Sequence, residues 1–461
     1  MRLAVTDGLL GNDVSVMDYG CGRGSDIRLL QDRGFDCVGW DPVHAPDGFR
    51  RASDVVNLGY VVNVIEDPEE RRDALVRAWN LAQRVLVVSA RLQAEAPEVS
   101  APYADGHVTR LGTFQKFYEQ QELRGWIDTV LDVPSVPAAP GVFYVFRDPG
   151  ARAAFVASRF RRAPAAPRLR IGEQLFIEHK RLFEALAAFI STRGRVPAPE
   201  ELPEYAEIET EIGSLSRAFR ALQSVSEEGA WDRIRDVRKQ DLLVFVALSR
   251  FDGRPKFGEL PLSLQHDVKA FFGTYKHACT AADEHLFALG RPEQLAEACR
   301  SSPIGKIMPR AIYVHVDAVA ELPMLLRLYE GCARGYIGAV QGANIVKLAN
   351  DEPKVSYLSY PDFDRDPHPA LIASLSVNLR TFKVRQRHYS ASRNPPILHR
   401  KEAFLTHDHP LYAKFAGLTR SEEAKGLYID PSRIGTRDGW QTVLDAGGFE
   451  LRGHRLVRRK G

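Results

Sequence analysis

The chain has 461 residues, of which 44% are hydrophobic and 26% charged, with a formal net charge of +3. These values are ordinary for a soluble globular protein of two or three domains, and the net charge is too small to indicate a partner. No apolar run approaches a membrane span, and the amino terminus lacks the basic-then-apolar layout of a signal peptide. We therefore expect a cytoplasmic protein with no membrane partner.

The cysteines argue against covalent or metal cross-links. They are odd in number, widely scattered and include no C-x-x-C pair: Cys21, Cys37, Cys279, Cys299 and Cys332. A disulfide framework or a structural zinc site is therefore not expected, and we predict no metal.

Residues 18–24, with the sequence D-Y-G-C-G-R-G, follow the apolar run 14–17 and precede the helix-like run 26–30. This order predicts a strand, a tight glycine turn and a helix. Glycine has no Cβ, so the backbone bends sharply there and a ligand can approach it closely. The spacing is G-x-G-x-G and not the dinucleotide pattern G-x-G-x-x-G, because Ser25 replaces the last glycine.

The acid before the turn indicates which ligand it holds. A carboxylate at Asp18 would repel a pyrophosphate but attract the ammonium group of a methionine moiety. The stretch therefore looks like the first motif of class I S-adenosylmethionine (SAM) methyltransferases. We predict that the cofactor site contains Asp18, Gly20, Cys21, Gly22 and Gly24.

A second acid supports this interpretation. Residues 35–41 read as the next strand, ending in Asp41, which follows Asp18 by 23 residues. In doubly wound folds an acid about 20 residues past the glycine turn binds ribose hydroxyls. The alternatives are a glycine-rich surface turn in which Asp41 caps a loop, or a nicotinamide or flavin site, which the two acids disfavour.

The pattern continues to residue 149. Strands are predicted at 54–60, 84–89 and 141–146, and helices at 68–81 and 113–131, with room for only a loop or a very short strand between Asp41 and Asp54. The fold class is therefore α/β, with a Rossmann-like SAM-methyltransferase domain over residues 1–149. Asn57 and Tyr60 follow from this fold as residues on the methyl-acceptor side; their other interpretation is ordinary packing at the end of a strand.

Three further regions are predicted. Residues 150–172 form a basic linker that can contact phosphates, with six arginines and no acid: Arg152, Arg159, Arg161, Arg162, Arg168 and Arg170. Residues 173–303 form a helical region, with amphipathic spacing over 173–190 and 233–250. Residues 304–461 form a mixed α+β domain of unknown role.

Polar, proline-containing loops in that last domain allow several interpretations. Asp362, Asp364 and Asp366 alternate as in a calcium loop, but the glycine and glutamate of that motif are missing. With Lys347 or Lys401 they also suggest a metal-dependent nuclease, although no nuclease motif fits.

Residues 394–397, N-P-P-I, resemble the N-P-P-aromatic loop of amino-methyltransferases without the aromatic residue. The simpler interpretation is a rigid turn here and a helix capped by Asp366 at Pro367. We also expect four residues to line a polar pocket: His368, His399, Arg400 and Lys401.

Nearly the whole chain resembles a known family, the DNA phosphorothioation-associated methyltransferases. The motifs that carry the resemblance are 18–24, 57–68 and 112–118 in the first half, and 329–334, 354–364, 394–402 and 453–455 in the second. The resemblance implies a bacterial setting beside enzymes that place sulfur in the DNA backbone, with DNA and other phosphorothioation proteins as partners.

Two hypotheses remain open from the sequence. In the first, the protein is a SAM-dependent methyltransferase acting on DNA or a nucleic-acid-linked target, which its later domains present. In the second, it is a SAM-binding regulatory or DNA-recognition subunit that transfers no methyl group. Methyl transfer is a displacement at a sulfonium carbon, so the enzyme mainly aligns donor and acceptor and needs no metal.

Overall fold

The computed structural model describes residues 1–461 apart from 12, 97–100, 110–111, 163–166, 168–177 and 460–461. The chain divides into two units. The α/β unit comprises Met1–Asp148, Leu295–Leu322 and Tyr329–Gly461, and the helical unit comprises Pro149–Gln294 and Pro323–Leu328. Within the described ranges, no helix combines the length and the apolar character needed to cross a bilayer.

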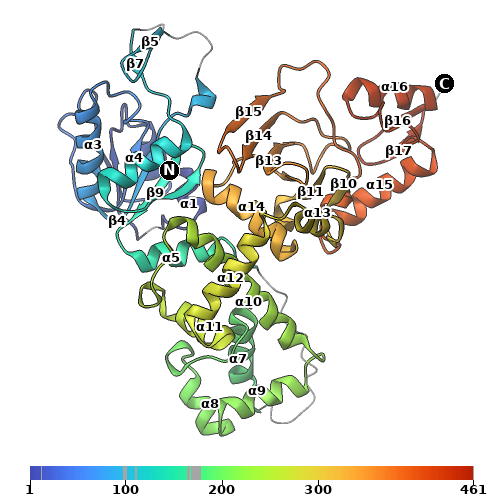
Figure 1. Ribbon diagram of the computed structural model, residues 1–461, viewed down its shortest axis with the longest axis horizontal. Helices are drawn as coiled ribbons and strands as arrows, with labels where there is room; N and C mark the ends of the chain where they lie inside the picture. Colours follow the sequence, from blue (N-terminus) through green and yellow to red (C-terminus); the bar gives the residue numbers. More distant parts are fainter. Residues whose placement is uncertain (12, 97–100, 110–111, 163–166, 168–177, 460–461) are drawn as a thin grey trace. The chain divides into compact units, whose positions relative to one another are not determined.

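A six-stranded sheet forms the amino-terminal part of the α/β unit (Figure 1). β1 to β4 pair in parallel, β9 runs antiparallel to β4, and β8 antiparallel to β9. The chain passes from β1 to β2 on one side and returns to β3 on the other, so ligands are expected at the carboxyl ends of β1 and β3. The spatial order is β2 (Cys37–Trp40), β1 (Val16–Tyr19), β3 (Ser53–Gly59), β4 (Ala82–Ser89), β9 (Val142–Phe146) and β8 (Val136–Ala139).

Continuous apolar runs explain why these strands lie inside the sheet. Met17, Val56 and Leu86 are fully buried, as expected for parallel strands covered on both faces. The same core includes Leu75 of α3 (Pro68–Leu81) and Ile127 of α4 (Gln120–Leu131). α3 has the predicted bounds: the Asp67 side chain accepts a hydrogen bond from the Glu69 amide at 2.8 Å. Two short helices, α1 (Arg2–Thr6) and α2 (Ser25–Gln31), complete this part.

The prediction of a continuous helix over 113–131 is wrong in its first half. Phe114 and Gln115 form strand β7, which pairs with β6 (Gly106–Val108), and β6 pairs with β5 (Ala101–Tyr103). A side chain at Gly106 would lie 2.6 Å from the Phe114 ring, so glycine is what allows this close pairing. The helix begins only at Gln120.

The carboxy-terminal part of the α/β unit contains a second six-stranded sheet, antiparallel throughout. Helix α14 (Met324–Ile337) lies between β11 and β12 in the sequence. The strands in spatial order are β10 (Lys306–Met308), β11 (Ala311–His315), β12 (Ile345–Ala349), β13 (Lys354–Ser359), β14 (Ala373–Asn378) and β15 (Val384–His388).

The remaining elements of this part are α15 (Tyr412–Ala424), α16 (Arg437–Gly447) and the hairpin β16 (Phe449–Leu451) and β17 (Leu456–Arg458). The helix predicted to start at Pro367 does not form. The Asp366 carboxylate instead accepts a hydrogen bond from the His368 amide at 2.9 Å, which closes a local turn.

The two sheets belong to one unit, whereas the sequence divided them into domains 1–149 and 304–461. The Ala339 amide donates to the Ala138 carbonyl at 2.8 Å, and the Gln120 side chain donates to the Tyr336 carbonyl at 3.2 Å. Gly338, with φ of +75°, lets the end of α14 approach β8, because a Cβ there would lie 2.3 Å from backbone atoms of Ala138. Such contacts join segments about 200 residues apart in the sequence, so local sequence patterns do not predict them.

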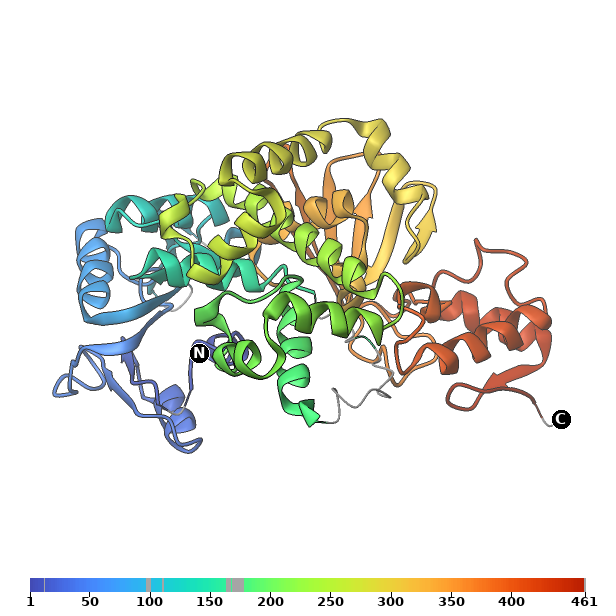
Figure 2. The same cartoon turned by 90° about the horizontal axis from the view of Figure 1, so that it is seen from below.

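In the helical unit the described residues form helices and no strand (Figure 2). Its helices are α5 (Pro149–Ser158), α7 (Lys180–Arg193), α8 (Tyr205–Ile212), α9 (Leu215–Ser224), α10 (Ala230–Leu248), α11 (Leu262–Phe272) and α12 (Tyr275–Ala288). α13 (Pro292–Arg300) crosses from this unit into the other.

The segment predicted as a basic linker, 150–172, folds differently where it is described. α5 occupies its start, and Arg162 is buried, with its Nε 2.9 Å from a carboxylate oxygen of Asp241. Arg162 therefore holds the helical unit together and cannot lie along a phosphate backbone. Arg168 and Arg170 lie outside the described residues.

Gly338→Ala should destabilise the α/β unit. A left-handed backbone costs a non-glycine residue roughly 1–2 kcal/mol, and the new methyl group also collides with the backbone of Ala138. Gly335→Ala is the matched control, because Gly335 is an exposed helical residue with nothing within 4 Å of a new Cβ; it should be neutral or stabilise by up to about 1 kcal/mol. Denaturant unfolding of both variants measures this, and equal stabilities would contradict the proposed contact.

Candidate functional site

The glycine turn between β1 and α2 is bound to the end of β2. The amides of Gly20 and Cys21 both donate to the Trp40 carbonyl, at 2.8 and 3.1 Å, and the Gly24 amide donates to the Cys21 carbonyl at 3.0 Å. Gly20, Gly22 and Gly24 have φ of +86°, +52° and +71°. These angles strain any other residue, so the glycine pattern predicted from the sequence has a backbone reason.

Each of these glycines has different surroundings. A Cβ on Gly20 would lie 2.3 Å from the Val61 side chain, which follows β3, so Gly20 is needed for packing. A Cβ on Gly22 would meet nothing within 4 Å, so the space beside its backbone is open. A ligand can therefore approach the backbone at Gly22 but not at Gly20.

Asp18 is the next-to-last residue of β1 and carries a buried carboxylate, since the residue is 6% exposed. Its Oδ1 accepts a hydrogen bond at 2.8 Å from the Asn57 side chain, since the parallel register places Asn57 of β3 directly beside Asp18. In the described part of the chain Asn57 is the only hydrogen-bond donor to this carboxylate. Burial raises the pKa of Asp18, the Asn57 bond opposes this, and the nearby carboxylates of Asp26 and Asp41 add to the increase.

Asp41 follows β2 and organises the turn. Its Oδ1 accepts from the amides of Val43 and His44 at 2.9 and 2.8 Å, and its Oδ2 accepts from the Gly22 amide at 3.0 Å. Partial burial acts to raise the pKa of Asp41, but the bonds from His44, Val43 and Gly22 outweigh it and lower the pKa below its usual value. Asp41 thus ties its own loop to the glycine turn, and Oδ2 retains a free lone pair for a ligand.

Cys21 lies within the turn as a neutral thiol. Burial raises its pKa, and the charges of Asp18 and Asp41 raise it further. Its side chain packs above Gly39 of β2, where a Cβ would approach the Cys21 side chain to 3.0 Å. Cys21 is therefore a packing residue of the turn and has no thiolate to offer as a nucleophile.

These carboxylates make the site negative. Asp18, Asp26 and Asp41 lie close enough for Asp26 and Asp41 to raise the pKa of Asp18. Like charges gathered around an open turn attract a cation and repel an anion. The geometry therefore suits a positively charged ligand and disfavours a pyrophosphate.

A cavity of about 760 Å³ lies at the carboxyl ends of β3 and β4, in the α/β unit. Tyr60 and Ser89, which follow or end these strands, line it together with Asp26 of α2. Gln386 and His388 of β15, from the second sheet, line it too. The cavity is thus built by both sheets, and its volume is in the range of small-molecule sites.

The two residues predicted on the acceptor side are separated by the structure. Tyr60 lines the cavity, with its side chain 54% exposed and its backbone in the left-handed region at φ of +59°. Its amide donates to the Ser89 carbonyl at 2.8 Å, which holds this strained conformation. Asn57 instead turns to Asp18 and is 6% exposed, so it acts on the carboxylate and does not face the cavity.

The sequence assigned no role to several lining residues: Asp26, Ser89, Gln386 and His388. Asp26 stands two residues past the last glycine of the turn, so its closeness to the site could have been read from the sequence. Gln386 and His388 belong to an exposed edge strand of the other sheet, and no motif surrounds them.

The loops of the carboxy-terminal part form a packed cluster. The rings of His368 and His399 lie 4.3 Å apart, and each packs against Trp440. His368 Nε2 lies 2.7 Å from the fully buried Glu422 carboxylate. The two predicted histidines therefore come together, but as rings packed against each other and against Trp440. Arg400 lies over the ring of Tyr428, which also contacts His399.

Lys401 is the most buried cation of this cluster region. Its Nζ donates to the carbonyls of Phe363 and Asp366, both at 2.6 Å, and lies 3.0 Å from the His454 ring. Burial lowers its pKa to about 7. These bonds fix the loop 363–366, which gives Lys401 a structural role.

Two alternatives for these loops are not supported. The Asn394 side-chain oxygen accepts from the Asp438 amide at 2.9 Å and the Pro395 carbonyl from the Arg437 amide at 3.2 Å, so both acceptors that an amine substrate would need are occupied. Among the described residues, no group of three or more His, Cys, Asp or Glu side chains is placed to hold a metal ion.

No protein-family model and no curated protein matches the chain. Two solved structures are similar to part of it. The 1,6-didemethyltoxoflavin-N1-methyltransferase of Burkholderia thailandensis, solved with 1,6-didemethyltoxoflavin and S-adenosylhomocysteine, is 15% identical at a TM-score of 0.24, over 31% of this chain and 75% of that one. An O-methyltransferase family protein from the same organism is 16% identical at a TM-score of 0.22, over 32% and 55%. At these low identities and TM-scores, a function for this chain has to rest on its own geometry.

Asp41→Ala should loosen the turn. The amides of Gly22, Val43 and His44 lose their acceptor, so their hydrogen exchange should accelerate at least about tenfold, which corresponds to about 1.4 kcal/mol of local opening energy. Because the pKa of Asp41 is lowered in the fold, protection should persist above its ordinary pKa and disappear as the pH falls through the lowered value. Asp47→Ala, an exposed carboxylate in the same loop, is the control. Unchanged exchange at Gly22 would contradict the role of Asp41.

Proposed function

We propose that the protein is a SAM-dependent methyltransferase whose acceptor is DNA or a nucleic-acid-linked group. The observation that carries the proposal is the buried Asp18 carboxylate at the end of β1, beside a glycine turn with open space at Gly22. The sheet supports it, with parallel strands β1 to β4 and an antiparallel β9. In such a sheet, ligands bind at the carboxyl ends of the parallel strands, where Asp18 and the glycine turn lie.

The residues present fit the chemistry of SAM. Asp18 has one oxygen engaged by Asn57, which leaves the other to accept from the ammonium group of the methionine part. The open backbone at Gly22 allows close approach, and the remaining lone pair of Asp41 Oδ2 suits a ribose hydroxyl. SAM supplies a methyl group on a sulfonium centre.

The charge of the site separates this cofactor from a dinucleotide. SAM carries an ammonium and a sulfonium, both of which the carboxylates of Asp18, Asp26 and Asp41 attract. A nicotinamide or flavin dinucleotide would bring a pyrophosphate to the same turn, where the carboxylates repel it. The negative site therefore favours SAM.

The 760 Å³ cavity is the proposed acceptor site. It adjoins the carboxyl ends of β3 and β4, and the exposed Tyr60 offers a ring against which a flat base can stack. His388 is the one imidazole among its lining residues and is a candidate base if the acceptor must lose a proton. The choice of DNA, and of other phosphorothioation proteins as partners, rests on the resemblance of the long motifs to the phosphorothioation-associated family.

The second candidate is a SAM-binding regulatory or DNA-recognition subunit. One observation favours it: Asn57, predicted on the acceptor side, is committed to Asp18, so the strand end offers the cavity no polar side chain from that position. The two candidates share the SAM site and differ only in whether a methyl group is transferred.

Asp18→Ala should abolish SAM binding, measured by calorimetry, because the ammonium group loses its carboxylate. Asp36→Ala, which removes an exposed carboxylate paired with Arg51, should leave the affinity unchanged. SAM affinity of the unaltered protein should fall with decreasing pH as the raised pKa of Asp18 is crossed, and Asn57→Ala should move this fall to higher pH. Equal affinity for SAM in the Asp18 and Asp36 variants would refute the site.

Tritiated-methyl transfer separates the two candidates. With duplex and single-stranded DNA, modified and unmodified, the methyltransferase should label the nucleic acid, and Tyr60→Ala should reduce kcat/KM at least about tenfold, near 1.4 kcal/mol, with SAM affinity retained. Saturable SAM binding without any labelled product from these DNAs would favour the regulatory subunit.

A further inference from the structure

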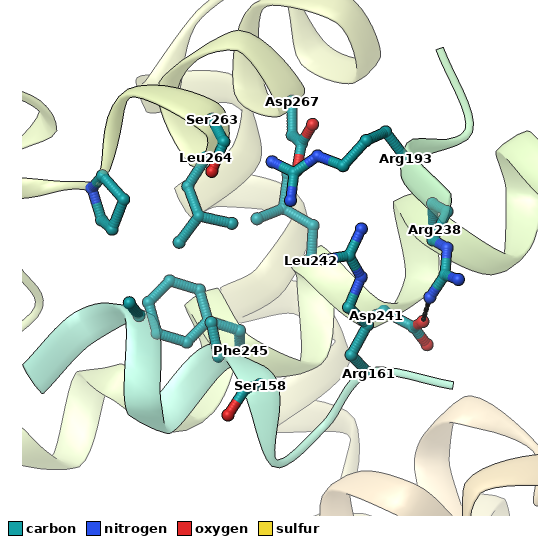
Figure 3. A pocket seen from close by; sticks show the side chains of 13 residues that line it. Ser158, Arg161, Arg193, Arg238, Asp241, Leu242, Phe245, Ser263, Leu264 and Asp267 are labelled. Atoms are coloured by element: carbon teal, nitrogen blue, oxygen red, sulfur yellow. Dashed lines mark hydrogen bonds and ion pairs between the residues drawn. The ribbon is translucent and has the colours of Figure 1, made fainter. Parts of the chain in front are cut away.

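A second cavity, of about 250 Å³, lies within the helical unit and has two unlike sides (Figure 3). Phe245 of α10 and Leu264 of α11 lie on one side. The guanidinium groups of Arg161 and Arg193 gather on the other side, and the carboxylates of Asp241 and Asp267 line the cavity too. The cavity thus offers an apolar surface opposite a charged one.

Two of its arginines have hydrogen-bond capacity that the described residues leave unused. Arg238 has a side chain only 6% exposed; its Nη1 bonds to the Arg162 carbonyl and to Asp241, while its Nε has no partner in the described part of the chain. Arg193 pairs with Asp267 through Nη2 at 2.8 Å, and its Nε is likewise without a described partner. A buried donor left unbonded is costly, so positive charge at this wall of the cavity is incompletely compensated by the described residues.

The charges around the cavity do not balance. The ion pairs of the described residues form two clusters. Asp241 pairs with Arg162, Arg238 and Arg327, whereas Asp267 pairs with Arg193 and Arg195, and Arg195 also pairs with Glu201. Arg161 lies near both carboxylates without a described ion pair, so these groups comprise six arginines and three carboxylates. Arg161 is exposed as a residue, but partial desolvation of its guanidinium lowers its pKa, and the charge of Arg238 lowers it further. A network that served folding alone would gain from equal numbers, because each uncompensated buried charge is costly.

We infer that this cavity binds a phosphate monoester with a flat, apolar organic part, as in a nucleoside monophosphate. A phosphate dianion would offset most of the excess positive charge, and it would offer acceptors to the guanidinium groups that line the cavity, those of Arg161 and Arg193. The base would lie against the apolar side formed by Phe245 and Leu264. The inference concerns the helical unit alone and does not depend on the SAM site.

The test is calorimetry of the full-length protein with deoxynucleoside monophosphates, inorganic phosphate and deoxynucleosides. We expect saturable binding of at least one monophosphate, weaker binding of phosphate, and none of the nucleosides. Arg161→Gln should weaken monophosphate binding about tenfold, and Arg161→Gln with Arg193→Gln should abolish it. Asp267 would remain paired with Arg195 at 2.7 Å, so the double variant should fold. Arg220→Gln, which removes an exposed charge from α9, should bind normally.

Leu264→Ser separates the two sides of the cavity. It should weaken the monophosphates while leaving inorganic phosphate unchanged, because it alters only the apolar side. Circular dichroism checks the fold of each variant. Because Arg161 is exposed, Arg161→Gln should fold even if the double variant does not, and the single variant then tests the inference by itself. Binding of no monophosphate and no phosphate, or equal binding by the Arg161 and Arg220 variants, would overturn the inference.

The monophosphate could be free or could end a DNA strand. Displacement of a bound fluorescent nucleotide by a 5′-phosphorylated oligonucleotide, but not by its 5′-hydroxyl counterpart, would identify a strand end as the source. Displacement by mononucleotides alone would identify the free nucleotide. Either result requires that the phosphate group is what the arginines bind.

Discussion

The pairing of Asp18 with Asn57 is the interaction on which the amino-terminal site depends. Burying a lone carboxylate costs several kcal/mol unless a donor compensates it, and Asn57 supplies that donor from the neighbouring strand. The pair exists because β1 and β3 are adjacent and parallel in a register that sets Asp18 beside Asn57. A charge is thereby held at the strand end with one oxygen still open, which is the condition for binding a cationic ligand there.

The turn around this carboxylate was largely predictable, because its information is local. Three glycines at alternate positions permit the positive φ angles that the structure contains, and the acid before them lies one residue from the end of the strand. The role of Asn57 was not predictable, since it depends on a strand register between residues 39 positions apart. The sequence predicts that Asn57 lies near the end of its strand, but it does not show whether the Asn57 amide points toward Asp18 or toward the acceptor side.

The same limit explains what the sequence missed in the later regions. Arg161 and Arg162 stand in an arginine-rich, acid-free stretch that suggested contact with phosphate backbones, yet Arg162 pairs with Asp241, 79 residues along the chain. The sequence alone does not reveal whether a charged side chain pairs with a bound ligand or with another residue of the folded protein. An element whose pattern is local, such as α3, formed at its predicted position. The join between Gly338 and Ala138 had no sequence signal.

The glycine turn at β1 and the cavity of the helical unit have opposite electrostatic character, and this contrast constrains which ligand each can bind. Carboxylates surround the turn at β1, whereas an arginine excess surrounds the cavity of the helical unit. A ligand with a sulfonium and an ammonium would be repelled by the second, and a phosphate by the first. The acidic turn therefore suits a cationic ligand, and the arginine-lined cavity suits a separate ligand that carries a phosphate. Placing them in separate units prevents each ligand from competing for the other's site.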